Sequence, residues 1–167
     1  MKPTALWIML AVACAQPDPS SAQAALTAPL LPEGQLLFVT RGQAGAIFIA
    51  NPTERRRGQV VETLALEIYD IPITLARGAL VQRVTRQRLD CAKRTRQVLG
   101  SAGYDAEGKL VVSSPEEPAA SIQGYSGYDV IAAVVCDGDT PPGNVVVDSS
   151  VQAAQWSRDR LMKKQNR

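Results

Sequence analysis

Cys91 and Cys136 are the residues of this 167-residue sequence best suited to covalent or metal chemistry, together with Cys14 near the N-terminus. The sequence contains no histidine, and two cysteines without histidine make a poor zinc site. The distance between Cys91 and Cys136 along the chain also differs from the Cys-x-x-Cys spacing of a redox-active pair. A structural disulfide is favoured if the chain reaches an oxidising compartment.

Residues 1–24 have the pattern of a secretory signal peptide. Met1 and Lys2 form a short positive start, residues 5–13 are apolar, and residues 22–24 read Ala-Gln-Ala, a typical cleavage pattern. The apolar run is shorter than the ~20 residues that span a membrane. A buried N-terminal helix is the weaker alternative, because the Pro-containing segment 16–21 cannot continue a helix. We therefore expect export and cleavage after Ala24.

Cys14 leaves a second mode of processing open. Small residues precede it directly, as in a bacterial lipoprotein signal, in which the thiol is acylated and becomes the mature N-terminus. Residues 15–32 would then form an extended tether rich in Pro, Ser and Ala. Both modes exclude Cys14 from disulfide pairing, so Cys91 and Cys136 remain as an even pair and are predicted to be bonded.

No catalytic, cofactor-binding or metal-binding residues are predicted. Glu116 and Glu117 are adjacent and flanked by prolines, so their carboxylates should point apart rather than act as a pair. Without histidine, acid–base or triad chemistry would need an unusual set of groups, and residues 100–108 lack phosphate-loop spacing. We expect a protein that is not an enzyme. A small hydrolase or inhibitor is an alternative that a deep pocket lined by polar side chains from several strands would favour.

Basic residues gather at two places in the sequence. Arg55, Arg56 and Arg57 form one turn and are a candidate patch for an acidic protein or glycan partner. A further six basic residues crowd two predicted strands, where a solvated sheet face is the competing interpretation; they are Arg83, Arg86, Arg88, Lys93, Arg94 and Arg96. The net charge of +2 is too small to indicate a nucleic-acid partner, and nothing in the sequence fixes an oligomeric state.

The elements that must position these residues are mainly strands. Short apolar runs or period-two patterns predict about six antiparallel strands, at 34–39, 44–50, 59–69, 79–90, 95–104 and 109–113, with a candidate edge strand at 145–147. In the third of these, Leu64, Leu66 and Ile68 share one face, with Thr63, Glu67 and Tyr69 on the other. In the fourth, one face carries Val81, Arg83, Thr85, Gln87 and Leu89.

One helix is predicted to pack against this sheet. Ser126 and Asp129 resemble a capping box, Tyr128, Ile131 and Val135 form a helical stripe, and Gly138 follows the end. Residues 149–167 predict a basic terminal helix that should fray, since its apolar stripe is thin. The expected organisation is a signal peptide at 1–24, a linker at 25–34, an α+β domain at 35–138 and a C-terminal extension at 139–167.

The predicted domain resembles the surface-adhesin protein E family of Gram-negative bacteria. The resemblance covers roughly residues 35–136 and rests on three features: the run QRLDCAKRTR at 87–96, the run YDAEGKLVVS at 104–113, and a short helix ending at Cys136. It departs from the family in having no tryptophan near the mature start and in the tail after Gly138.

This resemblance implies an antiparallel sheet with a packed helix and a disulfide between the two cysteines. It also implies a non-enzymatic, exported binding or envelope protein, since founding members of the family are adhesins that bind host matrix proteins. A periplasmic or lipid-anchored structural protein without a host ligand is the alternative. Localisation is expected in the periplasm or on the outer surface, with no transmembrane span, no nucleic-acid partner and no cofactor.

Overall fold

The computed structural model describes residues 29–42, 44–50, 56–124 and 126–165. Three residues singled out in the sequence, Cys14, Ala24 and Arg55, lie outside this part of the chain. Among the described residues, no helix is both long and apolar enough to cross a membrane.

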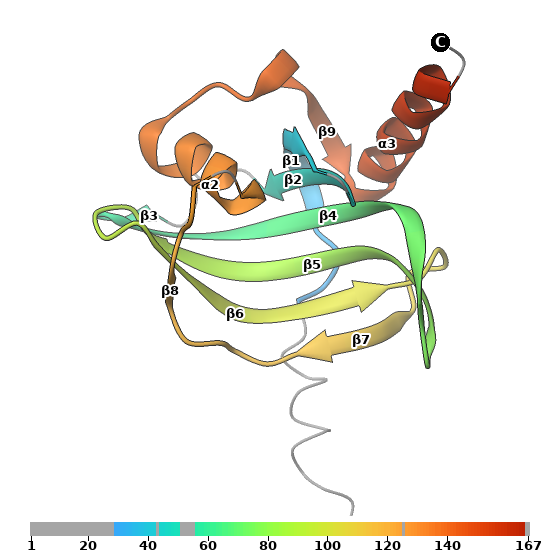
Figure 1. Ribbon diagram of the computed structural model, residues 1–167, viewed down its shortest axis with the longest axis horizontal. Coiled ribbons are helices and arrows are strands. Elements are labelled where there is room, and N and C mark those ends of the chain that lie inside the picture. Colours follow the sequence, from blue (N-terminus) through green and yellow to red (C-terminus); the bar gives the residue numbers. More distant parts are fainter. Residues whose placement is uncertain (1–28, 43, 51–55, 125, 166–167) are drawn as a thin grey trace, which may run out of the picture.

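The fold is built on one antiparallel sheet (Figure 1). Its strands follow the spatial order β7-β6-β5-β4-β2-β1-β9, while β3 pairs with β4 and β8 pairs with β6. The bounds are β1 Glu33–Arg41, β2 Gly45–Ala50, β3 Arg56–Arg57, β4 Val60–Leu75, β5 Gly78–Asp90, β6 Thr95–Tyr104, β7 Leu110–Ser114, β8 Ala120–Ser121 and β9 Val146–Ser149. The predicted class, α+β with a mainly antiparallel sheet, is therefore confirmed.

The prediction of about six strands was too low, because the sheet has nine among the described residues. The six predicted runs correspond to β1, β2, β4, β5, β6 and β7. The short strands β3 and β8 have two residues each, which is too few for an alternating pattern to reveal. The ninth strand, β9, pairs with β1 at the edge of the sheet, where the sequence indicated only a candidate.

Both faces of the central strands are buried. Phe38, Phe48 and Leu66 belong to one hydrophobic core, and Val39 and Ile49, their neighbours along the chain, belong to a second core on the opposite face. Alternate residues of a strand point to opposite faces. This arrangement explains why residues 36–39 and 46–49 are continuous apolar runs rather than alternating ones.

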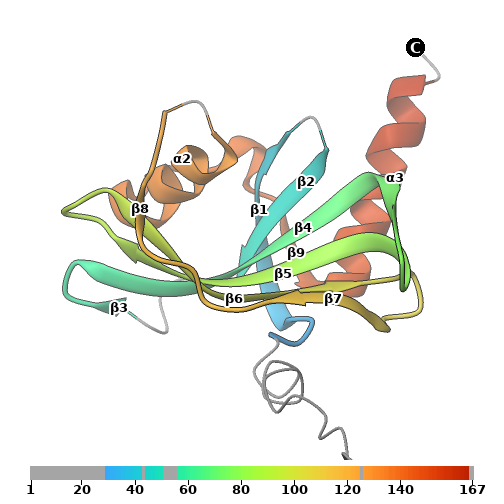
Figure 2. The same cartoon turned by 60° about the horizontal axis from the view of Figure 1, so that its bottom comes forward.

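A helix packs against each core. In Figures 1 and 2, α2 and α3 lie at opposite ends of the curved sheet. Helix α2 spans Gly127–Ala132, continues as a π-helical turn over Ala133–Asp137, and ends at Gly138 in the left-handed conformation, with φ of 77°. A short 3-10 turn, Pro142–Asn144, then leads to β9 and helix α3, Ser150–Gln165.

Helix α3 differs from the fraying tail that its sequence predicts. The Trp156 ring lies 4.6 Å from the Phe38 ring and 5.7 Å from the Phe48 ring between centroids, and Ala153 is fully buried. The sequence of this helix has no broad apolar stripe, but the single large ring of Trp156 provides the apolar contact with the sheet. The described part of the chain thus contains two packed helices, α2 and α3, rather than one helix and a loose tail.

Candidate binding site between helix α2 and the sheet

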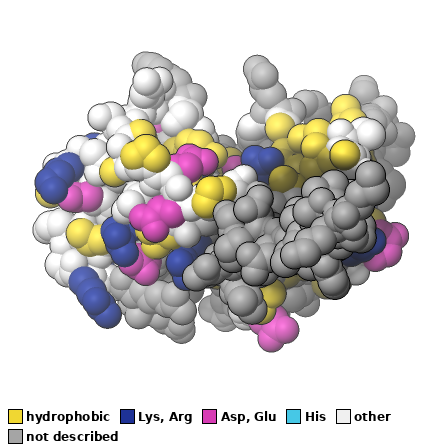
Figure 3. Space-filling view, turned by 90° about the horizontal axis from the view of Figure 1, so that it is seen from below, with side chains coloured by type: hydrophobic (Ala, Val, Ile, Leu, Met, Phe, Trp, Pro, Cys, Tyr) yellow, Lys and Arg dark blue, Asp and Glu magenta, His cyan; other side chains and the backbone are white. Residues whose placement is uncertain are grey.

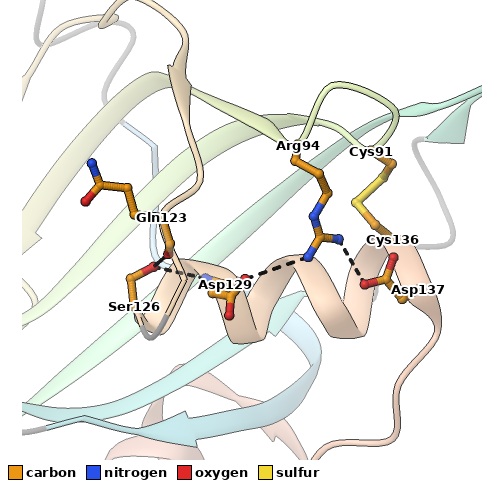
Figure 4. Close-up of polar contacts among 7 residues, drawn as sticks. All are labelled: Cys91, Arg94, Gln123, Ser126, Asp129, Cys136 and Asp137. Carbon is orange, nitrogen blue, oxygen red and sulfur yellow. Dashed lines mark hydrogen bonds and ion pairs between the residues drawn. A yellow bond between two sulfur atoms is a disulfide. The ribbon is translucent and has the colours of Figure 1, made fainter.

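A disulfide anchors the end of helix α2 to the sheet. Cys91, directly after β5, is bonded to Cys136, with the two Cα atoms 5.3 Å apart, so the predicted pairing is confirmed. Arg94 supports the same junction (Figure 4): its Nη1 atom donates to Asp137 Oδ2 at 2.9 Å, and its Nη2 atom lies 3.7 Å from Asp129 Oδ1. One covalent bond and two ion pairs therefore join the β5–β6 turn to the helix.

At the N-terminus of helix α2, the Ser126 half of the predicted capping box is present and the Asp129 half is not. The Ser126 side chain accepts a hydrogen bond of 3.1 Å from the Asp129 backbone N–H, as an N-cap does. The Asp129 carboxylate instead extends toward Arg94. The predicted stripe is buried as expected, with Ile131 and Val135 in the second core and Tyr128 packed against it.

The two described arginines of the candidate basic patch are both exposed, but one of them also contacts the helix. Arg56 and Arg57 lie on β3, but the Arg56 Nη2 atom donates a 2.8 Å hydrogen bond to the backbone carbonyl of Val135 in the helix. Both arginines are exposed, but Arg56 also helps to hold the helix, which leaves Arg57 as the described arginine of this turn without such a contact. Recognition of an acidic partner by this patch stays a prediction.

Most basic residues of the central strands have partners within the chain. Arg88 donates to Glu62, Lys93 pairs with Asp90, and Arg94 binds two aspartates of the helix. On the face shown in Figure 3, basic and acidic side chains are interspersed rather than gathered in one basic area. This view therefore shows no flat basic face, which is the feature that would favour binding by charge alone.

A cluster of polar and aromatic side chains lies instead between the start of helix α2 and the sheet. Glu67 accepts hydrogen bonds from Tyr69 Oη at 3.0 Å and from Tyr128 Oη at 3.4 Å. Its cross-strand partner is Arg83, whose guanidinium carbon lies 5.9 Å from the centre of the Tyr69 ring. The cluster thus joins β4, β5 and the helix.

Burial shapes the ionisation of both tyrosines. It raises the pKa of Tyr69 and of Tyr128 above the ordinary phenol value, and the negative charge of Glu67 raises both pKa values further. The phenols are therefore neutral donors at physiological pH, and the Glu67 carboxylate is held between them.

Gln87 and Arg96 form the second half of the cluster. Gln87 is fully buried on β5, and its Oε1 atom accepts a 2.5 Å hydrogen bond from Arg96 Nε. The Arg96 guanidinium lies over the Tyr128 ring, with its carbon 3.7 Å from the ring centre, a favourable cation–π arrangement. Arg96 consequently connects β5 and β6 to the helix.

Two pockets open beside this cluster. The first, which we call the Arg96 pocket, has a volume of about 240 Å³ and is lined by Arg96, Val98, Glu117, Ile122 and Tyr128 among others. The second, the Tyr69 pocket, has about 480 Å³ and includes Ala44, Glu67, Tyr69 and Gly127. Since Gly127 and Tyr128 are adjacent, the two pockets meet the first residues of the helix, and together we call them the α2 groove.

The sequence patterns predicted how the strand residues of this site are oriented, but not the contribution of the helix. It placed Glu67 and Tyr69 on one face of their strand and Arg83 and Gln87 on one face of theirs, and the cross-strand register brings these faces together. It could not show that the helix covers this face and brings Tyr128 to it. Glu116 and Glu117 lie on the extended segment between β7 and β8, and Glu117 lines the Arg96 pocket.

The described residues contain no group of three or more His, Cys, Asp and Glu side chains that could hold a metal ion. Comparisons with protein-family models, with curated proteins and with solved structures find no match to this chain. The site is therefore interpreted from its own chemistry.

Proposed function

We propose that this protein is an exported, non-enzymatic binding protein of the cell envelope and that it holds its partner in the α2 groove. The observation that carries the proposal is the cluster of Glu67, Tyr69, Arg96 and Tyr128, whose members line two pockets that each include a residue from the start of helix α2. Aromatic rings combined with a few oriented polar groups are the usual composition of a recognition site. The resemblance to surface-adhesin protein E favours a protein or glycan partner.

Two features support export. The N-terminal sequence has the pattern of a signal peptide, and a disulfide such as Cys91–Cys136 persists mainly in oxidising compartments. The disulfide also fixes the helix that forms one wall of the groove. A wall held in place before binding lowers the entropy lost when a partner is bound.

The chemistry of the groove supports binding rather than catalysis. Although polar groups from several strands meet there, the carboxylate of Glu67 accepts hydrogen bonds from two neutral phenols. A carboxylate occupied in this way is poorly placed to take a proton from a nucleophile. Arg96, in turn, stacks on Tyr128 and bonds to Gln87, an arrangement that orients a donor toward a ligand.

The experiment is a binding screen of the purified, oxidised protein against immobilised matrix proteins and sulfated glycans. Ala44 and Ala120 are exposed residues that line the Tyr69 and Arg96 pockets, respectively. Ala44→Trp and Ala120→Trp should each obstruct one pocket without disturbing the core. We expect one or both to weaken binding at least about tenfold, with Ala106→Trp, in an exposed turn, as the matched control.

Two outcomes would contradict the proposal. Binding that is unchanged in both groove variants would place the partner elsewhere on the molecule. The absence of binding to every matrix protein and glycan in the screen would favour the alternative, an envelope protein with a structural role and no host ligand.

A further inference from the structure

Arg96 is held in a fixed orientation but is not neutralised. Its Nε atom donates to Gln87 Oε1, and its plane lies over the Tyr128 ring. Neither contact removes the positive charge, and the Nη1 and Nη2 atoms have no hydrogen-bond or ion-pair partner among the described residues. The half-buried guanidinium thus presents a two-pronged donor at the wall of the Arg96 pocket.

Gln87 fixes the orientation of the Arg96 guanidinium. Arginine has only donors, so its partner on Gln87 must be the amide oxygen, and this fixes the orientation of the amide. The Gln87 Nε2 atom is then buried without a hydrogen-bond partner. Gln87 is fully buried and does not line the Arg96 pocket, so it positions the Arg96 side chain from within the sheet.

The rest of the pocket selects the kind of anion. Gln87 lies opposite Val98 in the strand register, and Val98, Pro118 and Ile122 provide an apolar lining. Glu117 is the acidic residue of the lining, so a ligand with several negative charges would be repelled. A planar guanidinium fork matches the two oxygens of a carboxylate.

We infer that the Arg96 pocket binds a single carboxylate that carries a short apolar substituent. The carboxylate takes the Nη atoms of Arg96, and the substituent contacts Val98 and Ile122. This inference rests on the proposed function, because it names the ligand of part of the same groove. A free carboxylic acid and the C-terminal residue of a peptide share this chemistry.

The test is calorimetric titration of the full mature protein with N-acetyl-L-leucine and with its neutral analogue N-acetyl-L-leucinamide. The acid should bind at least about tenfold more tightly than the amide, since the amide cannot neutralise Arg96. A peptide with a C-terminal leucine, as free acid and as amide, distinguishes the two sources. Tighter binding of the peptide acid than of N-acetyl-L-leucine identifies a peptide terminus, and equal binding identifies a free acid.

Two variants connect the effect to the pocket. Arg96→Lys keeps the charge but loses the fork, and it should weaken binding of the acid about tenfold while the amide is unaffected. Ala120→Trp obstructs the pocket from the position opposite Arg96 and keeps the Arg96 side chain, so it should abolish acid binding even if Arg96→Lys unfolds the helix. Arg77→Lys, at an exposed arginine in the turn between β4 and β5, is the matched control and should bind normally.

Equal affinity for acid and amide, or unchanged acid binding in Ala120→Trp, would overturn the inference. This failure is distinct from failure of the proposed function. A macromolecular partner that is lost in Ala44→Trp but retained in Ala120→Trp would leave the groove as a binding site and remove only the carboxylate pocket.

Discussion

Arg94 and Asp137 form an ion pair beside the disulfide, with the Arg94 Nη1 atom 2.9 Å from Asp137 Oδ2. Arg94 follows Cys91 by three residues and Asp137 directly follows Cys136, so the ion pair and the disulfide join the same two segments (Figure 4). Both side chains are more than two-fifths exposed, and an exposed pair contributes little to stability. The covalent bond therefore supplies most of the stability at this junction.

Removal of the disulfide should destabilise the protein strongly. Cys91→Ser or Cys136→Ser should lower the free energy of unfolding by ~2 to 5 kcal/mol, because the crosslink restricts the unfolded chain. The corresponding fall in melting temperature is about 5 to 20 °C. The double variant should melt like either single one, since all three lack the same bond. Wild-type melting of the single variants, or two free thiols in peptide mapping, would refute a structural role.

Two single substitutions distinguish the role of Arg57 in the basic turn from that of Arg56. If the patch recognises an acidic partner, Arg57→Ser should weaken binding and reduce its salt dependence while the melting curve stays unchanged. Arg56→Ser should in addition lower the melting temperature slightly, because Arg56 donates to the Val135 carbonyl of the helix. Binding that survives the triple replacement of Arg55, Arg56 and Arg57 by serine would exclude the patch as a site.

Stability should fall at alkaline pH. The pKa values of Tyr69 and Tyr128 are raised in the folded protein by burial and by Glu67, whereas an unfolded tyrosine titrates near pH 10. Above about pH 10 the unfolded state therefore releases protons that the folded state retains, and the free energy of unfolding decreases as pH rises. Below that pH these two groups make stability independent of pH.

Urea denaturation between about pH 9 and pH 11 measures this effect. The slope should be smaller in Tyr128→Phe and in Tyr69→Phe than in the wild type, because each variant lacks one of the shifted groups. Tyrosinate absorbance provides a second readout. Ionisation of every tyrosine of the folded protein near its ordinary pKa would contradict the buried arrangement around Glu67.

Helix α3 should prove to be an integral part of the fold. Trp156→Ala removes the ring that packs against Phe38 and Phe48 and should cost ~2 to 4 kcal/mol, somewhat below the range for a fully buried tryptophan. Gln155→Ala, on the exposed side of the same helix, should have almost no effect. Chemical denaturation of the two variants in parallel makes the comparison, and equal stability would mean that the helix contributes nothing to the core.

The mature N-terminus should be Ala25. An Ala-Gln-Ala sequence at 22–24 follows an apolar run of signal-peptide length. Mass spectrometry of the protein from whole cells reports the first residue and any lipid together. Recovery of an acylated Cys14 as the first residue would replace this prediction with lipidation, and an intact Met1 would exclude both.

The sequence by itself determined the antiparallel strands, the helix near Tyr128 and the pairing of Cys91 with Cys136. Alternation and capping are local patterns, and once Cys14 is set aside as part of the signal segment, the two remaining cysteines can pair in only one way. It also placed Glu67 and Gln87 on defined faces of their strands, because side chains alternate along a strand. It did not reveal the two-residue strands β3 and β8, which are too short to carry a pattern.

Only the tertiary structure decided what those faces meet. Arg96 and Tyr128 are far apart in sequence, and their stacking depends on how the disulfide-linked helix packs against the second core of the sheet. Likewise, the thin apolar stripe of α3 predicts a loose tail until Phe38 and Phe48 provide a surface for Trp156. Local patterns fix which side of an element is apolar, but the partner of that side is set by long-range packing, which no short stretch of sequence encodes.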